Sequence, residues 1–200
     1  MKRSVLMIVV TLLSLQYSVY SQSMGKGKSV FYIGVGGPHA YVGAGKFRGV
    51  GYSYITTPSL HLGFERGISE GIPQSTIGLG GHLFVWTGNA SYRDSHGYGY
   101  NNSWTSVTAL FRGFYHHKFL VGEKWDVYAT LCAGIRYWAY SYNYNDSRYA
   151  IDPYGYTSVL PATGVSIGGR YYVGKSFGFY AEVSQGYNVD YAQVGFAFKF

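Results

Sequence analysis

Charged residues are scarce in this chain. Asp, Glu, Lys and Arg make up 12% of its 200 residues, about half the share found in a typical soluble domain. Basic residues outnumber acidic ones by 16 to 9, for a formal net charge of +7, but the surplus is spread along the chain without a basic run. A nucleic-acid-binding surface is therefore not expected.

Cysteine is rare, and long hydrophobic runs are missing. Cys132 is the single cysteine, so an intramolecular disulfide is impossible, and its distance from the N-terminus argues against a lipid anchor there. The apolar run from Val5 to about Leu15 is too short for a transmembrane helix, and no later segment reaches the required length. If the chain enters a membrane, it does so as strands.

The first residues have the layout of a secretory signal peptide. Lys2 and Arg3 precede the apolar run, and side chains of small or modest size follow it at residues 19–21. A positive end, an apolar middle and small residues at the cleavage site are typical of cleaved signals. We predict a signal peptide over residues 1–21 and a single exported domain over residues 22–200.

Glycine and aromatic residues are abundant, and they are arranged in alternation. The chain contains 29 Gly, 23 Tyr and 12 Phe. In the segment "YAQVGFAFKF", every second side chain from Ala192 to Phe200 is apolar, and those between them are small or polar. This period of two indicates a β-strand with one apolar face. The same pattern predicts eight strands, over residues 29–37, 59–68, 76–86, 106–119, 126–140, 163–173, 177–187 and 191–200.

The predicted connections alternate in length. The long ones cover residues 43–58, 89–103 and 141–159, and the short ones cover 69–74, 121–124 and 174–175. Only the connection over residues 186–190 is short where a long one is due. Such sorting is typical of outer-membrane barrels, which have both termini on the side of the short turns.

Charges in the predicted strands fall almost entirely on the face that has the small residues. They are Glu65, Arg112, Lys118, Arg136, Arg170, Glu182 and Lys199. The interior of a narrow barrel has room only for side chains, so glycine must offset bulky rings and buried charges must pair. The opposite face has essentially no charge, as contact with lipid requires. The sequence therefore predicts an all-β, eight-stranded antiparallel up-and-down transmembrane barrel, monomeric and with a filled lumen.

The inward charges are expected to form a shared ionic network, with Tyr hydroxyls satisfying the remaining donors. Its predicted members are Glu65, Arg112, Arg136, Arg170 and Glu182. A turn at residues 174–175 sets Arg170 opposite Tyr180 and leaves Glu182 one diagonal step away. Removal of one buried partner from such a network is expected to be costly.

Aromatic residues are expected in two girdles at the two membrane interfaces. The predicted girdle near the short turns contains Phe31, Phe119, Trp125, Tyr171, Phe177, Phe179, Phe198 and Phe200. The one near the long loops contains Tyr41, Trp86, Tyr92, Trp104, Tyr137, Trp138 and Tyr187.

The predicted signal peptide, the alternating strands and the ending "VGFAFKF" resemble small outer-membrane β-barrel proteins of the OmpA/OmpX-like type. In that family a terminal Phe, preceded by aromatic or apolar residues at every second position, is recognised by the barrel assembly machinery. The resemblance implies this role for Phe196, Phe198 and Phe200. It also implies a location in the cell outer membrane, with lipid, lipopolysaccharide and the assembly machinery as partners.

The third long loop is the candidate for contact with a ligand outside the cell. Its sequence, "SYNYNDSRYAIDPYGYTS", mixes Tyr with Asn, Ser, Gly and Asp, a composition that makes adaptable recognition surfaces. The predicted contact residues are Tyr142, Tyr144, Tyr149, Tyr154 and Tyr156. In the alternative interpretation these tyrosines simply extend the strands above the membrane as a ribbon, without a ligand.

Candidate chemistry is sparse. His116 and His117 are adjacent, so their side chains point to opposite faces of a strand, and we interpret them as a polar pair near the periplasmic rim. No nucleophile motif accompanies a histidine near the outer leaflet, so catalysis is not expected. A metal or a cofactor is not expected either. The sequence favours a structural or adhesion-like surface-interaction role. Two alternatives stay open: an enzyme that modifies lipopolysaccharide acyl chains, and a narrow pore.

Overall fold

The computed structural model describes residues 24–37, 46–49, 52–69, 75–93, 99–145 and 154–200. The predicted signal peptide lies outside these residues. They form ten strands: β1 (Ser29–Gly36), β2 (Lys46–Gly49), β3 (Tyr52–Thr56), β4 (Ser59–Ser69), β5 (Ser75–Arg93), β6 (Gly99–Val121), β7 (Trp125–Asn145), β8 (Tyr154–Tyr172), β9 (Phe177–Tyr187) and β10 (Ala192–Lys199). Within these ranges no helix is long and apolar enough to cross a membrane.

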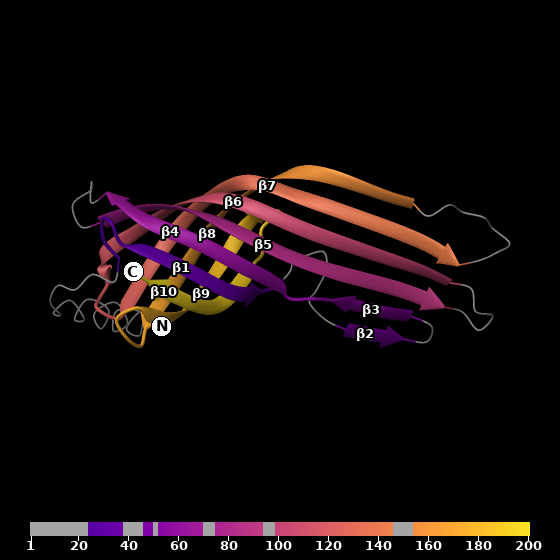
Figure 1. Ribbon diagram of the computed structural model, residues 1–200, viewed down its shortest axis with the longest axis horizontal. Helices are drawn as coiled ribbons and strands as arrows, with labels where there is room; N and C mark the ends of the chain where they lie inside the picture. The colour runs from indigo at the N-terminus through magenta and orange to yellow at the C-terminus, as the bar shows by residue number, and fades with distance from the viewer. Residues whose placement is uncertain (1–23, 38–45, 50–51, 70–74, 94–98, 146–153) are drawn as a thin grey trace, which may run out of the picture.

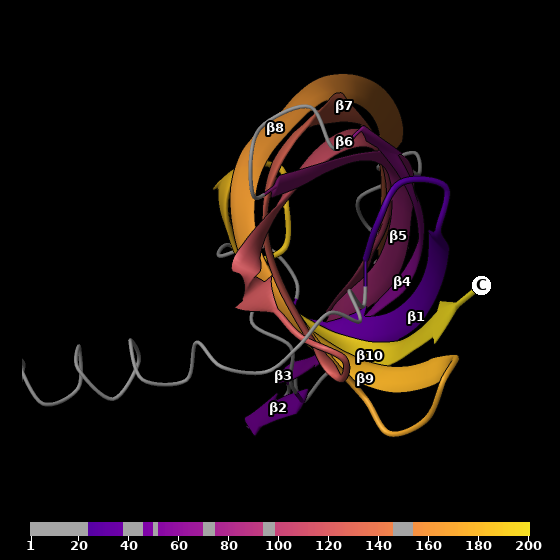
Figure 2. The same cartoon turned by 90° about the vertical axis from the view of Figure 1, so that its left-hand side faces the viewer.

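Eight of the strands close into a ring. β1 pairs with β4 on one side and with β10 on the other, and β5 pairs with β6. The order β5-β4-β1-β10-β9-β8-β7-β6 therefore returns to its start, with antiparallel pairing throughout. Figure 2 shows this ring end-on. The predicted fold class, an eight-stranded antiparallel barrel, is confirmed.

The two faces of each strand differ as the alternation predicts. In β4, Leu60 and Leu62 are 59% and 42% exposed on the outside, whereas His61 and Glu65 are 1% and 0% exposed inside. Leu131, near the middle of the β7 segment in the ring, is 70% exposed. The outer wall is therefore apolar, and the polar and charged side chains fill the lumen, an arrangement that suits a barrel surrounded by lipid.

One end of the ring holds the start of β1 and the end of β10, where Val30 faces Lys199. The segment before β1 folds back onto this end, since the N–H of Gly27 donates to the carbonyl of Gly67 over 2.8 Å. Gly27 has a φ of 84°, a conformation that glycine adopts without strain. Met24 is only 1% exposed and packs into the buried cluster around Tyr32. This end of the lumen is thus closed by apolar side chains.

The structure has ten strands where the sequence predicted eight. β2 and β3 form a hairpin inside the predicted long loop 43–58. β3 then continues the ladder on β5, with Tyr52 opposite Tyr92 and Thr56 opposite Gly88. The backbone of Thr57 extends this ladder through a hydrogen bond to the carbonyl of Thr87 over 2.9 Å.

The strands β5 to β8 also run well into the predicted loops 89–103 and 141–159. Cross-strand tyrosine pairs support the extra length: Tyr100 stacks on Tyr92 at 5.8 Å and on Tyr142 at 6.0 Å between ring centroids. Pairs of this kind stabilise neighbouring strands. Figure 1 shows β2, β3 and the far ends of β5 to β8 reaching beyond the short strands β1, β9 and β10.

We call this extension the projecting sheet. It consists of β2 and β3 together with residues 86–93 of β5, 99–106 of β6, 138–145 of β7 and 154–158 of β8, which the strand registers place side by side.

A charge on the outer wall tests the orientation of the barrel. We expect Leu131→Arg to lower the free energy of unfolding in lipid vesicles by about 2–4 kcal/mol, because an Arg near the bilayer midplane is costly. The matched control is Val173→Arg, since Val173 is also exposed (53%) but lies at the short-turn end. There the cost should be about 0–1 kcal/mol. Equal shifts in the urea unfolding curves of the two variants would contradict a lipid-facing wall.

Candidate functional site

A neutral ionic cluster occupies the lumen near the short-turn end. The guanidinium of Arg170 donates to Glu65 over 2.6 Å and to Asp126 over 3.0 Å. His116 lies on the other side of the same carboxylates, with Nε2 at 2.5 Å from Glu65 and Nδ1 at 2.7 Å from Asp126. Because ionised carboxylates only accept, both imidazole nitrogens donate. Two cations therefore balance two anions, and all four side chains are fully enclosed.

A second pair, Arg112 with Glu182, lies further along the lumen. Their side chains meet at 2.7 Å. The carboxylate of Glu182 also accepts from the Tyr128 hydroxyl over 3.0 Å and from the Gln193 amide over 2.7 Å. Arg112 donates in addition to the Tyr32 hydroxyl over 3.0 Å. Hydrogen bonds of this kind make a buried ion pair tolerable, although Nε of Arg112 has no partner among the described residues.

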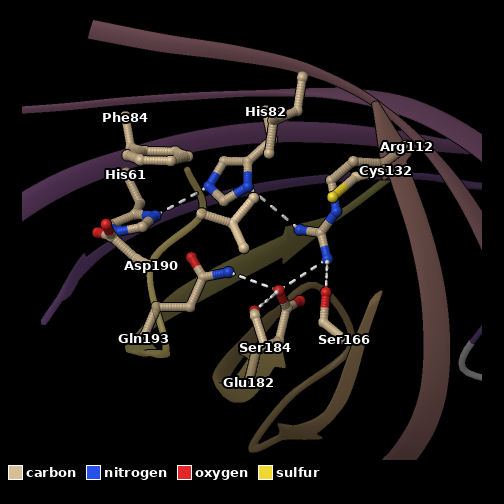
Figure 3. A pocket seen from close by; sticks show the side chains of 12 residues that line it. His61, His82, Phe84, Arg112, Cys132, Ser166, Glu182, Ser184, Asp190 and Gln193 are labelled. Atoms are coloured by element: carbon tan, nitrogen blue, oxygen red, sulfur yellow. Dashed lines mark hydrogen bonds and ion pairs between the residues drawn. The ribbon is translucent and has the colours of Figure 1, made fainter. Parts of the chain in front are cut away.

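A chain of hydrogen bonds runs from Arg112 to the far mouth of the lumen (Figure 3). Arg112 Nη1 lies 3.3 Å from His82 Nδ1, His82 Nε2 lies 2.9 Å from His61 Nδ1, and His61 Nε2 lies 3.0 Å from Asp190 Oδ2. Arginine only donates, so the direction of every bond follows: both imidazoles are neutral and have their proton on Nε2. Asp190 belongs to the connection between β9 and β10, which is thereby held in the mouth.

Little empty space remains among these side chains. The lumen region lined by His61, His82, Arg112 and Glu182 encloses a cavity of about 10 Å³, about the space of one water molecule. Among the described residues, no group of three or more His, Cys, Asp or Glu is placed to hold a metal ion. This part of the lumen has room for about one water molecule.

The five residues predicted to form one network are divided by the structure. Glu65 with Arg170 and Arg112 with Glu182 form two pairs, while Arg136 lies apart near the mouth. Arg136 donates to Ser106 over 2.8 Å and to Asn188 over 3.1 Å, and its guanidinium lies over the rings of Trp138 and Trp86 at 4.7 and 5.5 Å.

The expected pairing of Glu182 with Arg170 is wrong, although Glu182 does lie one diagonal step from Arg170. Arg170 does stand opposite Tyr180, as the turn at residues 174–175 predicted. Glu182 nevertheless pairs with Arg112 on β6, and Arg170 pairs with Glu65 on β4. The lumen is narrow enough for long side chains to reach strands that are not their neighbours in the sheet, so the diagonal rule for adjacent strands does not decide the partner.

Sequence reasoning missed four residues of these clusters: Asp126, His61, His82 and Asp190. It also misplaced His116, which is fully buried in the lumen and is not part of a polar pair at the rim. The signal was present, because His116 follows Arg112 and Phe114 at alternate positions and so shares their inward face. Asp190 lies outside the regular strands, and no periodicity could have found it.

The predicted assembly residues all point outward. Phe196, Phe198 and Phe200 are 46%, 40% and 72% exposed. Phe198 stands opposite Phe31 and Phe196 opposite Ile33 across the seam that closes the ring. On the other side, Phe177 contacts both Phe196 and Phe198 at 5.7 and 5.5 Å between ring centroids. These rings form part of the outward aromatic band that was predicted near the short turns.

The predicted surface tyrosines lie in the projecting sheet. Tyr142 stacks with Tyr100, and Tyr156 packs on Tyr140 at 5.7 Å. Tyr144 lies in β7 and Tyr154 begins β8, opposite Tyr142. Tyr149 falls outside the described residues. Four of the five residues thus belong to paired strands, as the ribbon interpretation expects.

The aromatic girdle predicted near the long loops is largely wrong. Trp86, Trp104 and Trp138 lie on the lumen side of their strands, in step with His82, Arg112 and Arg136 at even-numbered positions. Tyr92 shares that side. Of the predicted set, Tyr137 and Tyr187 are exposed on the outer wall, while Tyr41 lies outside the described residues. The odd or even position of a residue along its strand decides which way its ring points, whatever the distance of that residue from the turn.

The chain was compared with protein families, curated proteins and solved structures. No family model matches the chain, and no curated protein is similar to it. Among solved structures it is similar to the N-terminal β-barrel domain of Pseudomonas aeruginosa OprF, at 13% identity and a TM-score of 0.42, over 88% of this chain and 98% of that one. It is also similar to Ail of Yersinia pestis, solved with the heparin analogue sucrose octasulfate, at 12% identity and a TM-score of 0.45, over 88% and 99%.

A third similar structure is the transport unit of the autotransporter AIDA-I from Escherichia coli, at 11% identity and a TM-score of 0.41, over 87% of this chain and 57% of that one. The closed barrel is established by the strand pairing of the chain itself.

Proposed function

We propose that this protein is a sealed outer-membrane barrel that presents the projecting sheet to a partner outside the cell. The observation that supports this most directly is the contrast between its two parts. The ring has an apolar outer wall and a filled lumen, so it suits an anchor in lipid. The projecting sheet continues beyond the ring on the side away from the start of β1 and the end of β10 (Figure 1).

The two alternative functions have less support in the described lumen. A pore needs a continuous aqueous path, and the side chains around Arg112 leave room for about one water. An acyl-chain enzyme of the expected kind needs a histidine with one ring nitrogen beside a nucleophilic hydroxyl. The ring nitrogens of His61, His82 and His116 instead contact one another, Arg112 or a carboxylate. Lipid and lipopolysaccharide are then surroundings of a monomeric barrel, and the assembly machinery is its partner during insertion.

Cysteine labelling in intact cells tests the location and orientation. In a Cys132→Ser background, we expect Asn143→Cys, on the exposed outer face of β7 in the projecting sheet, to react with a membrane-impermeant maleimide. Lys175→Cys, at the exposed turn between β8 and β9, should react only after the outer membrane is permeabilised. The reverse pattern, or no labelling of Asn143→Cys in intact cells, would overturn the proposal.

A further inference from the structure

The projecting sheet is strongly one-sided. On the lumen side, its described side chains include eleven aromatic residues at alternate positions: Tyr52, Tyr54, Trp86, Tyr92, Tyr100, Trp104, Trp138, Tyr140, Tyr142, Tyr144 and Tyr156. On the opposite side, β5, β6 and β7 present small, polar or charged residues: Thr87, Asn89, Ser91, Arg93, Asn101, Ser103, Thr105, Ala139, Ser141 and Asn143. We call the lumen side of this sheet the aromatic face.

Neither of the usual roles of such rings accounts for the aromatic face. An interfacial girdle requires rings that point outward into the membrane, and these rings point to the lumen side. A closed core would bury them, but Tyr92 and Tyr156 remain 40% and 45% exposed. Contiguous apolar surface that stays exposed beyond the barrel usually marks a binding site.

The arrangement of the rings is fixed by the strands beneath them. Tyr92, Tyr100 and Tyr142 form a row across β5, β6 and β7, with neighbouring planes inclined by 27° and 24°. A side chain at Gly88 would collide with the indole of Trp104, so glycine there lets Trp104 lie across β5 and reach Tyr54 at 5.8 Å. Rings held in this way lose little entropy when they bind a ligand.

The chemistry of the aromatic face favours an uncharged, polyhydroxylated partner. Its described side chains include no charged residue, and Arg136, the cation beneath it, is only 7% exposed, so a polyanion or a basic peptide would find little counter-charge. On β3 and β5 to β8, the described side chains of this face also include no Leu, Ile, Val, Met or Phe, the aliphatic and purely apolar groups that a hydrophobic protein interface would use. Phe47 of the edge strand β2 stands opposite Tyr54. Every ring on β3 and β5 to β8 instead has a hydroxyl or an N–H beside its apolar surface. A sugar ring matches this, because its C–H groups form apolar patches bordered by hydroxyls.

We infer that the aromatic face binds a neutral glycan, laid along the row of rings that crosses β5, β6 and β7. The inference rests on the proposed function, since it supplies the chemical class of the partner that the projecting sheet contacts. The filled lumen below, where the guanidinium of Arg136 lies over the rings of Trp86 and Trp138, would form the floor of the site and stop the glycan from entering the barrel.

Direct binding measurements test this inference on the whole barrel in phosphocholine nanodiscs, which avoid detergents with sugar head groups. The probes are maltohexaose, cellohexaose and chitohexaose, with a heparin hexasaccharide as the charged comparison. We expect at least one neutral probe to bind by calorimetry and to shift the tryptophan fluorescence. The affinity should not fall in about 0.5 M salt, a concentration that screens exposed charges.

Matched variants on one strand locate the site. Tyr100→Ala should weaken binding by about tenfold, the loss expected when one well-packed aromatic contact is removed. Asn101→Ala, the adjacent residue on the opposite face of β6, should leave the affinity unchanged. The inference is overturned if no neutral probe binds, if only heparin binds, or if the two variants lose affinity equally.

Failure of the inference can be told apart from failure of the proposed function. If Asn143→Cys is labelled in intact cells but no neutral probe binds, the surface-display proposal stands and the glycan assignment falls. If Asn143→Cys is not labelled, the orientation is wrong whatever the nanodiscs show.

Discussion

We expect Glu182→Ala to unfold at a much lower urea concentration than the wild-type barrel. Glu182 is 3% exposed and is the carboxylate that Arg112 contacts, at 2.7 Å. Without it, the guanidinium of Arg112 stays buried with neutral partners only, and the Gln193 amide and Tyr128 hydroxyl lose their acceptor. Removing one partner of a buried ion pair typically costs about 3–5 kcal/mol. The measurement is the gel shift between compact and unfolded forms across a urea series.

Three further variants decide whether the loss comes from this pairing. Glu123→Ala, in the exposed turn after β6, should unfold at the wild-type midpoint. Adding Arg112→Met to Glu182→Ala should recover part of the loss, because no buried charge is then left unpaired. Adding Arg170→Met should not recover it, because Arg170 is paired with Glu65 and Asp126. Recovery with Arg170→Met instead, or a wild-type midpoint for Glu182→Ala, would refute the pairing.

The barrel could be predicted from the sequence because its main constraint is local. Alternation at period two places each side chain inside or outside whatever its distant partners are. Counting residues on both sides of the turn at 174–175 predicted that Arg170 stands opposite Tyr180, and the register of β8 and β9 confirms it. The misplaced residues also follow this alternation, since His116 and Trp138 lie inward as their positions along the strands require. They were misplaced because their distance from the membrane rim was given more importance than the alternation.

The partners inside the lumen could not be predicted in the same way. Arg112 on β6 contacts Glu182 on β9, and Arg170 on β8 contacts Glu65 on β4. These pairs cross the lumen between strands that are not hydrogen-bonded to each other, so their geometry depends on the diameter and shear of the closed ring. Asp190 reaches His61 from a connection of irregular backbone, for which no pattern in the sequence gives a direction.

The length of the strands was underestimated for a different reason. Ser, Asn, Gly and Tyr near residues 89–103 and 141–159 are common in turns, yet Tyr and Thr also favour strands. Pairing across β5, β6 and β7 favours the strand conformation over a turn, because each residue by which a strand is extended also gains a cross-strand contact. A stretch of sequence shows its own composition, but it does not show which strand will pair with it.

The last prediction concerns the seam between β10 and β1. Phe200 makes two of its closing hydrogen bonds: its carbonyl accepts from the N–H of Ser29 over 2.8 Å, and its N–H donates to the carbonyl of Ser29 over 3.0 Å. Deleting Phe200 removes both bonds and the most outward ring of the row. Phe198→Asp keeps the backbone but places a charge on the lipid-facing rim. We expect both variants to be nearly absent from outer-membrane fractions in immunoblots and to be degraded in the periplasm.

The control and a second measurement separate recognition by the assembly machinery from stability. Lys199→Ala changes the residue between the two rings on the inner face, where the ammonium lies over Tyr172, and should leave the surface level near wild type because the outward row is intact. Refolding of the urea-unfolded proteins into lipid vesicles then needs no assembly machinery. If Phe198→Asp refolds in vesicles as completely as Lys199→Ala but is lost in cells, the row acts as a recognition signal. If it fails in both, the seam itself is broken by the charge. Wild-type levels of Phe198→Asp in the outer membrane would exclude both roles, since a lipid-facing row that tolerates a carboxylate neither contacts the bilayer nor guides assembly.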